Sequence, residues 1–250
     1  MKFQLTILEL VGSTNDVALE AARSGAEDGL VVWAQQQTKG RGQRNHTWES
    51  QPKSSLTFSV LFRPNQEELT FLGRFTALGA LAVGRAVQAK TGGEAQVKWP
   101  NDVLLNGKKI CGVLAETDLQ AGNANAVVVG VGANLLPGAF RENTAMNYPA
   151  SDILSETGCS LDAKTWLWAI LEAMEELREL LPGDAFVREW NERLAFKGEM
   201  KSIRNHKGET GLFRLLSVLS DGSRLVEDAD GQEFSLQSAE VLPSSSSSSG

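Results

Sequence analysis

The chain of 250 residues is long enough for one large domain and a small one, and 42% hydrophobic with 22% charged residues is typical of a globular protein with a core. The net charge of −7 repels nucleic acid and argues against duplex DNA as a partner. Two cysteines cannot build a disulfide framework, and we find neither a signal peptide nor a run of about 18 apolar residues, so we expect a cytoplasmic protein without a membrane span.

The first 90 residues combine strands with helices. Residues 16–24 and 67–90 have the apolar spacing of helices. Before the first of them, Ser13-Thr14-Asn15-Asp16 resembles a capping box, in which a hydroxyl and an acid three residues later satisfy free amide groups. Residues 37–55 are polar, contain glycine and lack periodicity, which predicts a long loop. We expect strands at 3–9, 30–36 and 56–62.

The middle of the chain predicts hairpins. Asn106-Gly107 is a strong hairpin signal because both central residues of the turn must take positive φ. A buried strand at 126–135 is expected to run into a glycine-containing turn over Gly130 to Asn134. Further strands are expected at 96–99, 102–105 and 108–116. This irregular mixture of strands and helices favours an α+β fold with a mixed sheet over a regular doubly wound fold.

The C-terminal part changes from helices to short strands. An amphipathic helix at 161–181 ends at Pro182-Gly183, and a shorter helix follows at 184–194. From residue 197 the pattern is one of alternating strands, with turns at 206–208, 221–222 and 230–231. We therefore predict a large domain over 1–195, a small β domain over 196–243 and a flexible serine-rich tail over 244–250.

The most basic segment that could bind a ligand runs from Gln37 to Trp48. It holds Lys39, Arg41 and Arg44, and glycines flank Arg41 on both sides. Glycine lets backbone N–H groups approach an anion, arginine makes bidentate contacts with phosphate, and a tryptophan can stack on a base. The segment matches neither a Walker loop nor a dinucleotide fingerprint. The alternative is an exposed basic loop.

Two further segments place polar groups beside predicted strands. Lys98 ends a strand next to Pro100, which stiffens the backbone, and Asp102 could hold a metal or orient the lysine. Asn134 follows the two glycines of the expected turn and offers a donor and an acceptor. The alternatives are an Asx-type turn with surface charges and a tight turn that leaves a core strand. Ser13-Thr14-Asn15 fits both helix capping and a polar ligand site.

In this order and at these intervals, the segments resemble the catalytic core of biotin protein ligases. The landmarks of that family are STN, QTxGRGxR with a downstream Trp, KWPND, KxxGxLxE and GxGxN, and the resemblance covers about residues 8–135. It implies a mixed sheet flanked by helices, related to class II aminoacyl-tRNA synthetase cores, with a small SH3-like C-terminal domain. The matching residues are Ser13 to Asn15, Gln37 to Arg44 with Trp48, Lys98 to Asp102, Lys109 to Glu116, and Gly130 to Asn134.

The resemblance also implies roles for individual residues. Lys98 and Arg41 would be catalytic, Lys98 binding the biotin carboxylate and the α-phosphate of ATP. Trp48 would pack at the adenine end, and Asp102 would hold Mg²⁺ or orient the lysine. The implied biotin-binding residues are Ser13, Thr14, Asn15, Gln37, Gly40, Arg41, Gly42, Gln43, Lys98, Gly112 and Leu114. The implied ATP- and adenylate-binding residues are Arg41, Arg44, Trp48, Asn101, Gly130 and Asn134.

The basic loop departs from the commoner GRGRRGRxW pattern of the family. Gln43, Asn45 and His46 stand where that pattern has Arg, Gly and Arg. Two positive charges are thereby lost or made pH-dependent. We expect Arg41, Arg44 and the lysine of KWPND to supply the remaining positive charge.

The function implied by the resemblance is ATP-dependent biotin–protein ligation. Biotin and MgATP would form biotinyl-5'-AMP with release of pyrophosphate, and biotin would then pass to a lysine of a carboxylase's biotin carboxyl carrier protein. STN begins at residue 13, which predicts a short form without a DNA-binding domain; monomer and homodimer both stay open. The alternatives are a lipoate or octanoate ligase or transferase, a biotin-responsive repressor, and a biotin-binding module without catalysis.

Overall fold

In the computed structural model, a large mixed sheet and a smaller antiparallel sheet organise the chain, and residues 1–43, 47–120, 122–140, 148–205 and 207–243 are described. The large sheet has the strand order β1-β2-β3-β7-β6-β5-β4. Its first two strands pair in parallel and the other neighbours pair antiparallel, which confirms the expected α+β fold with a mixed sheet. The strands are β1 (Gln4–Val11), β2 (Leu30–Gln37), β3 (Ser55–Phe62), β4 (Gln96–Lys98), β5 (Asp102–Leu105), β6 (Lys108–Gln120) and β7 (Asn123–Asn134).

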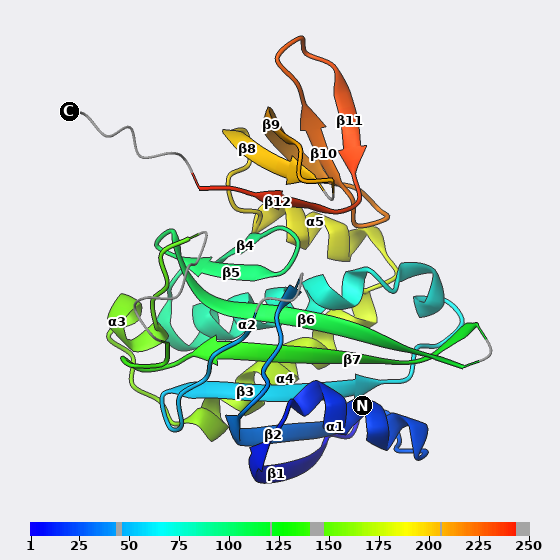
Figure 1. Ribbon diagram of the computed structural model, residues 1–250, viewed down its shortest axis with the longest axis vertical. Helices are drawn as coiled ribbons and strands as arrows, with labels where there is room; N and C mark the ends of the chain where they lie inside the picture. Colours follow the sequence, from blue (N-terminus) through cyan, green and yellow to red (C-terminus); the bar gives the residue numbers. More distant parts are fainter. Residues whose placement is uncertain (44–46, 121, 141–147, 206, 244–250) are drawn as a thin grey trace.

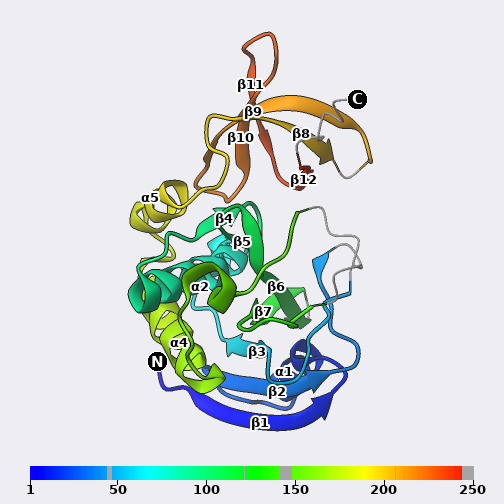
Figure 2. The same cartoon turned by 90° about the vertical axis from the view of Figure 1, so that its left-hand side faces the viewer.

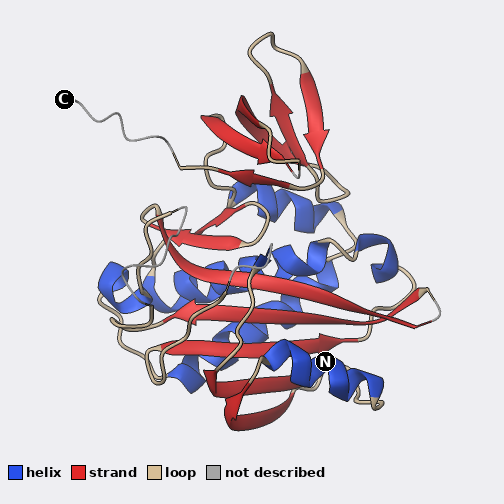
Figure 3. Cartoon of the chain, viewed as in Figure 1, coloured by secondary structure: helices blue, strands red, loops and turns tan. Residues whose placement is uncertain are grey.

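Helices cover both faces of the large sheet. α2 (Arg74–Thr91) and α4 (Ala163–Leu180) pack together on one face, whereas α1 (Thr14–Arg23) lies on the opposite face (Figure 2). α1 connects β1 to β2, which is the crossover that a parallel pair of strands requires. Figure 3 shows the same layers, with α2 and α4 in blue behind the sheet and α1 in front of it. On the face that carries α1, residues of β6, β7 and nearby loops line a cavity.

The core lies between α2, α4 and the sheet. All eight residues of β3 are buried, and α2 presents a nearly continuous buried surface rich in alanine. A Cβ atom at Gly79 of α2 would lie 2.8 Å from Val113 and 2.9 Å from Val129, so the helix approaches the sheet more closely than any larger residue allows. This packing holds β6 and β7 rigidly at the centre of the molecule.

The N-terminal ends of two predicted helices differ from the structure. The segment predicted as one helix over 67–90 is a short 3₁₀ turn, η2 (Glu68–Phe71), followed by α2 from Arg74. The side chain of Asn65 accepts hydrogen bonds from the backbone of Glu67 and Glu68, which favours a local turn over a continuous helix. The predicted capping box is also wrong, because Ser13 makes no capping hydrogen bond through its side chain.

The hairpin predicted at Asn106-Gly107 is confirmed. These residues have φ of 51° and 75° and connect β5 to β6. The predicted C-terminal helices are also present, as α4 and α5 (Asp184–Glu192), with the short helix α3 (Ile153–Thr157) before them.

The small sheet follows α5 and lies at one end of the molecule (Figure 1). Its strands pair antiparallel in the order β11-β10-β9-β8-β12, and Gly208, Gly222 and Gly231 take positive φ in the expected turns. The domain boundary at 195/196 stays a prediction, and the tail over 244–250 lies outside the described residues. The strands are β8 (Met200–Asn205), β9 (Thr210–Val218), β10 (Arg224–Glu227), β11 (Glu233–Leu236) and β12 (Ala239–Val241).

Hydrogen bonds fasten the small sheet to the rest of the chain. The indole Nε1 of Trp99 donates to the carbonyl of Gly222 at 3.0 Å. The guanidinium of Arg74 donates to the carbonyl of Ser220 at 3.0 Å, and the side chain of Asn191 exchanges two hydrogen bonds with the β9 backbone. These contacts set the position of the small sheet relative to the β4–β5 turn.

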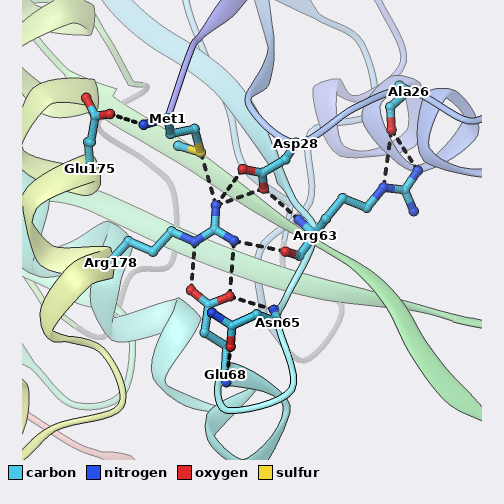
Figure 4. Close-up of polar contacts among 8 residues, drawn as sticks. All are labelled: Met1, Ala26, Asp28, Arg63, Asn65, Glu68, Glu175 and Arg178. Carbon is cyan, nitrogen blue, oxygen red and sulfur yellow. Dashed lines mark hydrogen bonds and ion pairs between the residues drawn. The ribbon is translucent and has the colours of Figure 1, made fainter.

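A cluster of ion pairs joins α4 to Asp28, just before β2, and to Glu68 of η2 (Figure 4). The guanidinium of Arg178 donates to both oxygens of Asp28 at 2.8 and 2.7 Å, and to Glu68 at 2.7 and 3.1 Å. It also donates to the carbonyl of Arg63 at 2.9 Å, so every guanidinium nitrogen has a partner.

Among the described residues, no helix is long and apolar enough to cross a membrane.

Candidate active site

One cavity of about 200 Å³ lies on the sheet face that carries α1. Its walls come from the start of α1, loop residues 41–43 and 47–49, the β4–β5 turn, the glycines of β6 and β7, and the first residues of β12. Of the described site residues predicted from the sequence, all except Gly40 line this cavity: Ser13, Thr14, Asn15, Gln37, Arg41, Gly42, Gln43, Trp48, Lys98, Asn101, Asp102, Gly112, Leu114, Gly130 and Asn134. Arg44, Asn45 and His46 lie outside the described residues.

Glycines of β6 and β7 form the floor of the cavity. Gly112 and Gly132 are partners across the two strands, and Trp48 lies directly over both. A Cβ atom at Gly132 would be 2.3 Å from the indole ring, and one at Gly130 would be 2.2 Å from the side-chain oxygen of Asn15. The turn predicted over Gly130 to Asn134 is therefore wrong. These residues belong to β7, and glycine is needed because other side chains lie flat on the strand.

Polar side chains at the start of α1 hold one another in place. Gln37 accepts hydrogen bonds from the backbone amide and the hydroxyl of Thr14, at 2.8 and 3.1 Å. The hydroxyl of Ser59 lies 2.7 Å from the Thr14 hydroxyl and 2.6 Å from the Asn15 side-chain oxygen. Asn15 in turn donates to the carbonyl of Leu114 at 3.2 Å. Because Thr14, Asn15 and Ser59 are buried and every group in the network is bonded, their orientation is fixed before any ligand arrives.

Arg41 lies at the rim of the cavity and is held by two carboxylates. Its guanidinium donates to Asp16 at 2.7 Å and to Glu116 at 3.0 Å. The hydrogen bond from Arg41 lowers the pKa of Asp16, and the same contact raises the pKa of Arg41 above its ordinary value. Glu116 also accepts a hydrogen bond from Asn15 at 2.6 Å, which joins this pair to the start of α1. Arg41 therefore keeps a full positive charge, matched by carboxylates outside the cavity wall.

A lysine–aspartate–lysine cluster lies at the other side of the cavity. The Lys98 ammonium donates to one oxygen of Asp102 at 2.9 Å, and the Lys109 ammonium lies 2.6 Å from the other oxygen. Burial by itself raises the pKa of Asp102, but Lys109 and Lys98 outweigh it and hold that pKa below its ordinary value. Within this cluster, two ammonium groups face one carboxylate. One positive charge remains for an anion in the cavity.

The described cavity residues contain buried polar atoms without a hydrogen-bond partner, among them the indole Nε1 of Trp48, a donor, and the side-chain Oδ1 of Asn134, an acceptor. The amide nitrogen of Asn134 is already used, donating to the carbonyl of Ser151 at 3.0 Å. Since buried polar groups are nearly always bonded, these two atoms fit contacts with a polar ligand.

Comparison with known proteins agrees with this arrangement. The profile of the biotin/lipoate A/B protein ligase family matches residues 7–134, which include the sheet floor, both basic segments and the start of α1. The biotin–[acetyl-CoA-carboxylase] ligase of Paracoccus denitrificans is 31% identical over 244 residues, covering 94% of this chain and 99% of that protein. This chain belongs to the biotin/lipoate A/B protein ligase family.

Solved structures of the family share the fold along the whole chain. A biotin protein ligase from Aquifex aeolicus, in complex with biotin and ATP, has a TM-score of 0.81 and 26% identity, covering 98% of this chain and 100% of that chain. The ligase from Leishmania major in complex with biotinyl-5-AMP has a TM-score of 0.61 and 25% identity, with 95% and 100% covered. The bifunctional ligase/repressor BirA of Bacillus subtilis is 35% identical over 127 residues, and the match spans 51% of this chain but 39% of that protein.

Several residues in or beside the site are not assigned from the sequence, among them Lys109, Ser59, Glu116 and Tyr148. Lys109 was part of a family landmark, yet nothing in its spacing reveals that it shares Asp102 with Lys98. Ser59 is a polar residue in an otherwise apolar strand, and that exception is a usable signal. Glu116 ends the same landmark as Lys109, but nothing local shows that it pairs with Arg41, and Tyr148 carries no local signal, because both partners lie far away in sequence. Conversely, Gly40 packs against the Trp48 carbonyl and so shapes the loop without lining the cavity.

Proposed function

We propose that this chain is a biotin–protein ligase that activates biotin with ATP and transfers the biotinyl group to a lysine of a carrier protein. One observation carries the proposal: Arg41, Lys98 and Lys109 meet around a single cavity whose floor is made of glycines. The positive charge left by the two lysines around Asp102 and the guanidinium of Arg41 at the rim suit anionic reactants, and the flat glycine floor suits a ring system. The wider family also includes lipoate ligases, whereas the Paracoccus denitrificans and Aquifex aeolicus proteins, which match along nearly the full chain, carry the names of biotin ligases.

In the first step, a carboxylate oxygen of biotin attacks the α-phosphorus of ATP. A phosphorus–oxygen bond forms, and the bond to pyrophosphate breaks with its electron pair leaving on pyrophosphate. Both reactants are anions, so the work of the protein is to neutralise charge and to position the groups. Lys98 and Lys109 are placed to do so, and the reaction needs no protein nucleophile.

In the second step, the neutral amine of a carrier lysine attacks the carbonyl of the mixed anhydride. An amide bond forms, AMP leaves with the electron pair of the broken bond, and the amine proton passes to AMP or water. Before that step, the anhydride must be kept from water. We propose that Trp48, with Arg41 to Gln43 beside it, provides the cover, since Trp48 already lies across the floor of the cavity.

Arg41 is proposed to contact the phosphate. The carboxylates of Asp16 and Glu116 hold its guanidinium at the rim, 2.7 and 3.0 Å away, so a phosphate has to compete with them. The gain from such exposed pairs is small, about 1 kcal/mol or less, and a phosphate in the cavity can displace them.

We assign no protein ligand to Mg²⁺. Both oxygens of Asp102 are bound by ammonium groups, and the described residues contain no cluster of three or more acidic, histidine or cysteine side chains. This donor set does not fit a divalent cation. Asp102 is therefore proposed to orient the two lysines, and Mg²⁺ is proposed to accompany ATP.

The carrier is proposed to belong to a carboxylase, and the protein is proposed to act in the cytoplasm.

The proposal is tested by pyrophosphate release from MgATP with biotin or lipoate as the acid. We expect release and a rise in thermal stability with biotin, and neither with lipoate. Release with lipoate alone would make the chain a lipoate ligase. A thermal shift with biotin but no pyrophosphate would leave a binding module without catalysis.

A further inference from the structure

Tyr148 lies where the cavity, the lysine cluster and the small sheet meet. The centre of its ring is 4.8 Å from the Lys98 ammonium, and its hydroxyl donates to the carbonyl of Leu242 at 2.9 Å. The ring of Phe196 stacks on the ring of Tyr148, with the two ring centres 5.6 Å apart and the ring planes 24° apart. The side chain is almost entirely buried, with 8% exposed, and it lines the cavity.

The ring face stabilises an ammonium group without neutralising it. An aromatic ring attracts a cation through its quadrupole, and the attraction grows when water is excluded. Lys98 is 6% exposed and shares the carboxylate of Asp102 with Lys109. A second carboxylate in the place of Tyr148 would also hold Lys98, but it would cancel the charge that an anionic substrate needs. The ring holds the ammonium and leaves its charge available.

The hydroxyl fixes the ring to the small sheet. Leu242 directly follows β12, and its amide donates to the carbonyl of Ser202 at 2.8 Å, so the accepting carbonyl is itself anchored. Burial, with smaller contributions from Asp102 and neighbouring glutamates, raises the pKa of Tyr148, and the phenol stays a donor at neutral pH. Ala239 and Glu240 of β12 line the same cavity.

From this geometry we propose that Tyr148 is a positioning residue for Lys98, which ties the placement of the small sheet to the first chemical step. The inference rests on the proposed ligase function. It assigns to the small sheet a part in setting the catalytic lysine, in addition to bordering the cavity.

The test compares Tyr148→Leu, which removes the ring, with Tyr148→Phe, which keeps the ring and removes the hydroxyl. Adenylate formation is measured by pyrophosphate release over a range of biotin concentrations. We expect Tyr148→Leu to lower kcat roughly tenfold with a smaller change in KM, as the loss of a desolvated cation–π contact implies. Tyr148→Phe should recover most of that rate. The matched control is Phe234→Leu, which removes an aromatic contact with Phe213 in the small sheet and should keep the wild-type rate.

A double-mutant cycle shows whether Tyr148 acts through Lys98. In a Lys98→Ala background, Tyr148→Leu should not lower the single-turnover rate of adenylate formation any further. A tenfold loss of rate in that background would overturn the proposal. A normal kcat in Tyr148→Leu alone would also overturn it. If Tyr148→Leu does not fold, Tyr148→Met replaces it, since it fills the volume without a ring face. Wild-type protein that releases no pyrophosphate would instead refute the ligase function itself.

Discussion

Two clusters of partly buried charge in this molecule combine cations and carboxylates in opposite ratios. Around Arg178, two carboxylates surround one guanidinium, all of whose nitrogens are bonded, and none of these residues lines the cavity. Around Asp102, two ammonium groups surround one carboxylate, and the cluster faces the cavity. The first arrangement satisfies its cation within the protein (Figure 4), whereas the second leaves positive charge for a ligand. For these two clusters, the ratio of cations to carboxylates thus distinguishes a structural contact from a site with charge left for a ligand, whereas Arg41, paired with Asp16 and Glu116 at the rim, has the ratio of the first cluster and the position of the second.

The largest effect is expected from Lys98→Ala. The variant should fold but form adenylate roughly 1000-fold more slowly, because it removes a charge proposed to stabilise the transition state. Pyrophosphate release gives the rate, and a circular dichroism melt serves as the control for folding. Near-normal activity in a folded Lys98→Ala protein would remove this lysine from the mechanism.

A second substitution probes the other cluster. Arg178→Met should lower the free energy of unfolding by roughly 3 kcal/mol, because it leaves Glu68, 4% exposed, without its main partner. Urea titration measures the loss, and the rate of adenylate formation per folded molecule should not change. A stable but inactive variant would contradict the separation of the two clusters.

Asp102→Asn tests the carboxylate shared by the two lysines. We expect adenylate formation to slow by roughly 10-fold to 100-fold, because both ammonium groups lose the group that positions them. The pKa of Asp102 lies below its ordinary value of 3.8 in the folded protein, so its charged form stabilises the fold above about pH 4, and this is lost as pH falls through the lower folded-state pKa. Urea titrations should therefore give the wild type a higher free energy of unfolding than Asp102→Asn at pH 5 to 7, and this difference should shrink below pH 4. If this difference in free energy of unfolding grew as the pH fell, it would contradict a lowered pKa of Asp102.

The smallest effect is expected from Glu116→Gln. The amide can still accept the hydrogen bond from Asn15, but the ion pair with Arg41 is lost, so the guanidinium is freer to meet a phosphate. KM for ATP should fall by about threefold, within the range of a partly exposed ion pair. The matched control is Glu227→Gln, which breaks a pair of similar exposure with Arg214 (31% against 30% for Glu116) in the small sheet. An equal change in both variants would argue for an effect of net charge alone.

Local signals in the sequence predicted most of the strands and helices, the family resemblance pointed to residues that line the cavity, and long-range contacts explain what both missed. The Asn106-Gly107 hairpin depends on adjacent residues, and so does the apolar run of β3. The glycines of β7 were assigned to a turn because the sequence does not show that Trp48 and Asn15 lie on that strand. Likewise, the acid expected to cap α1 pairs instead with Arg41, which is 25 residues away.

Mass spectrometry of a biotin carboxyl carrier domain, incubated with this protein, biotin and MgATP, tests the central claim most directly. The cavity that combines Arg41, Lys98 and Lys109 predicts a gain of one biotinyl group on one carrier lysine, dependent on ATP and abolished in Lys98→Ala. An unmodified carrier with the wild-type protein, or equal modification by Lys98→Ala, would contradict the account.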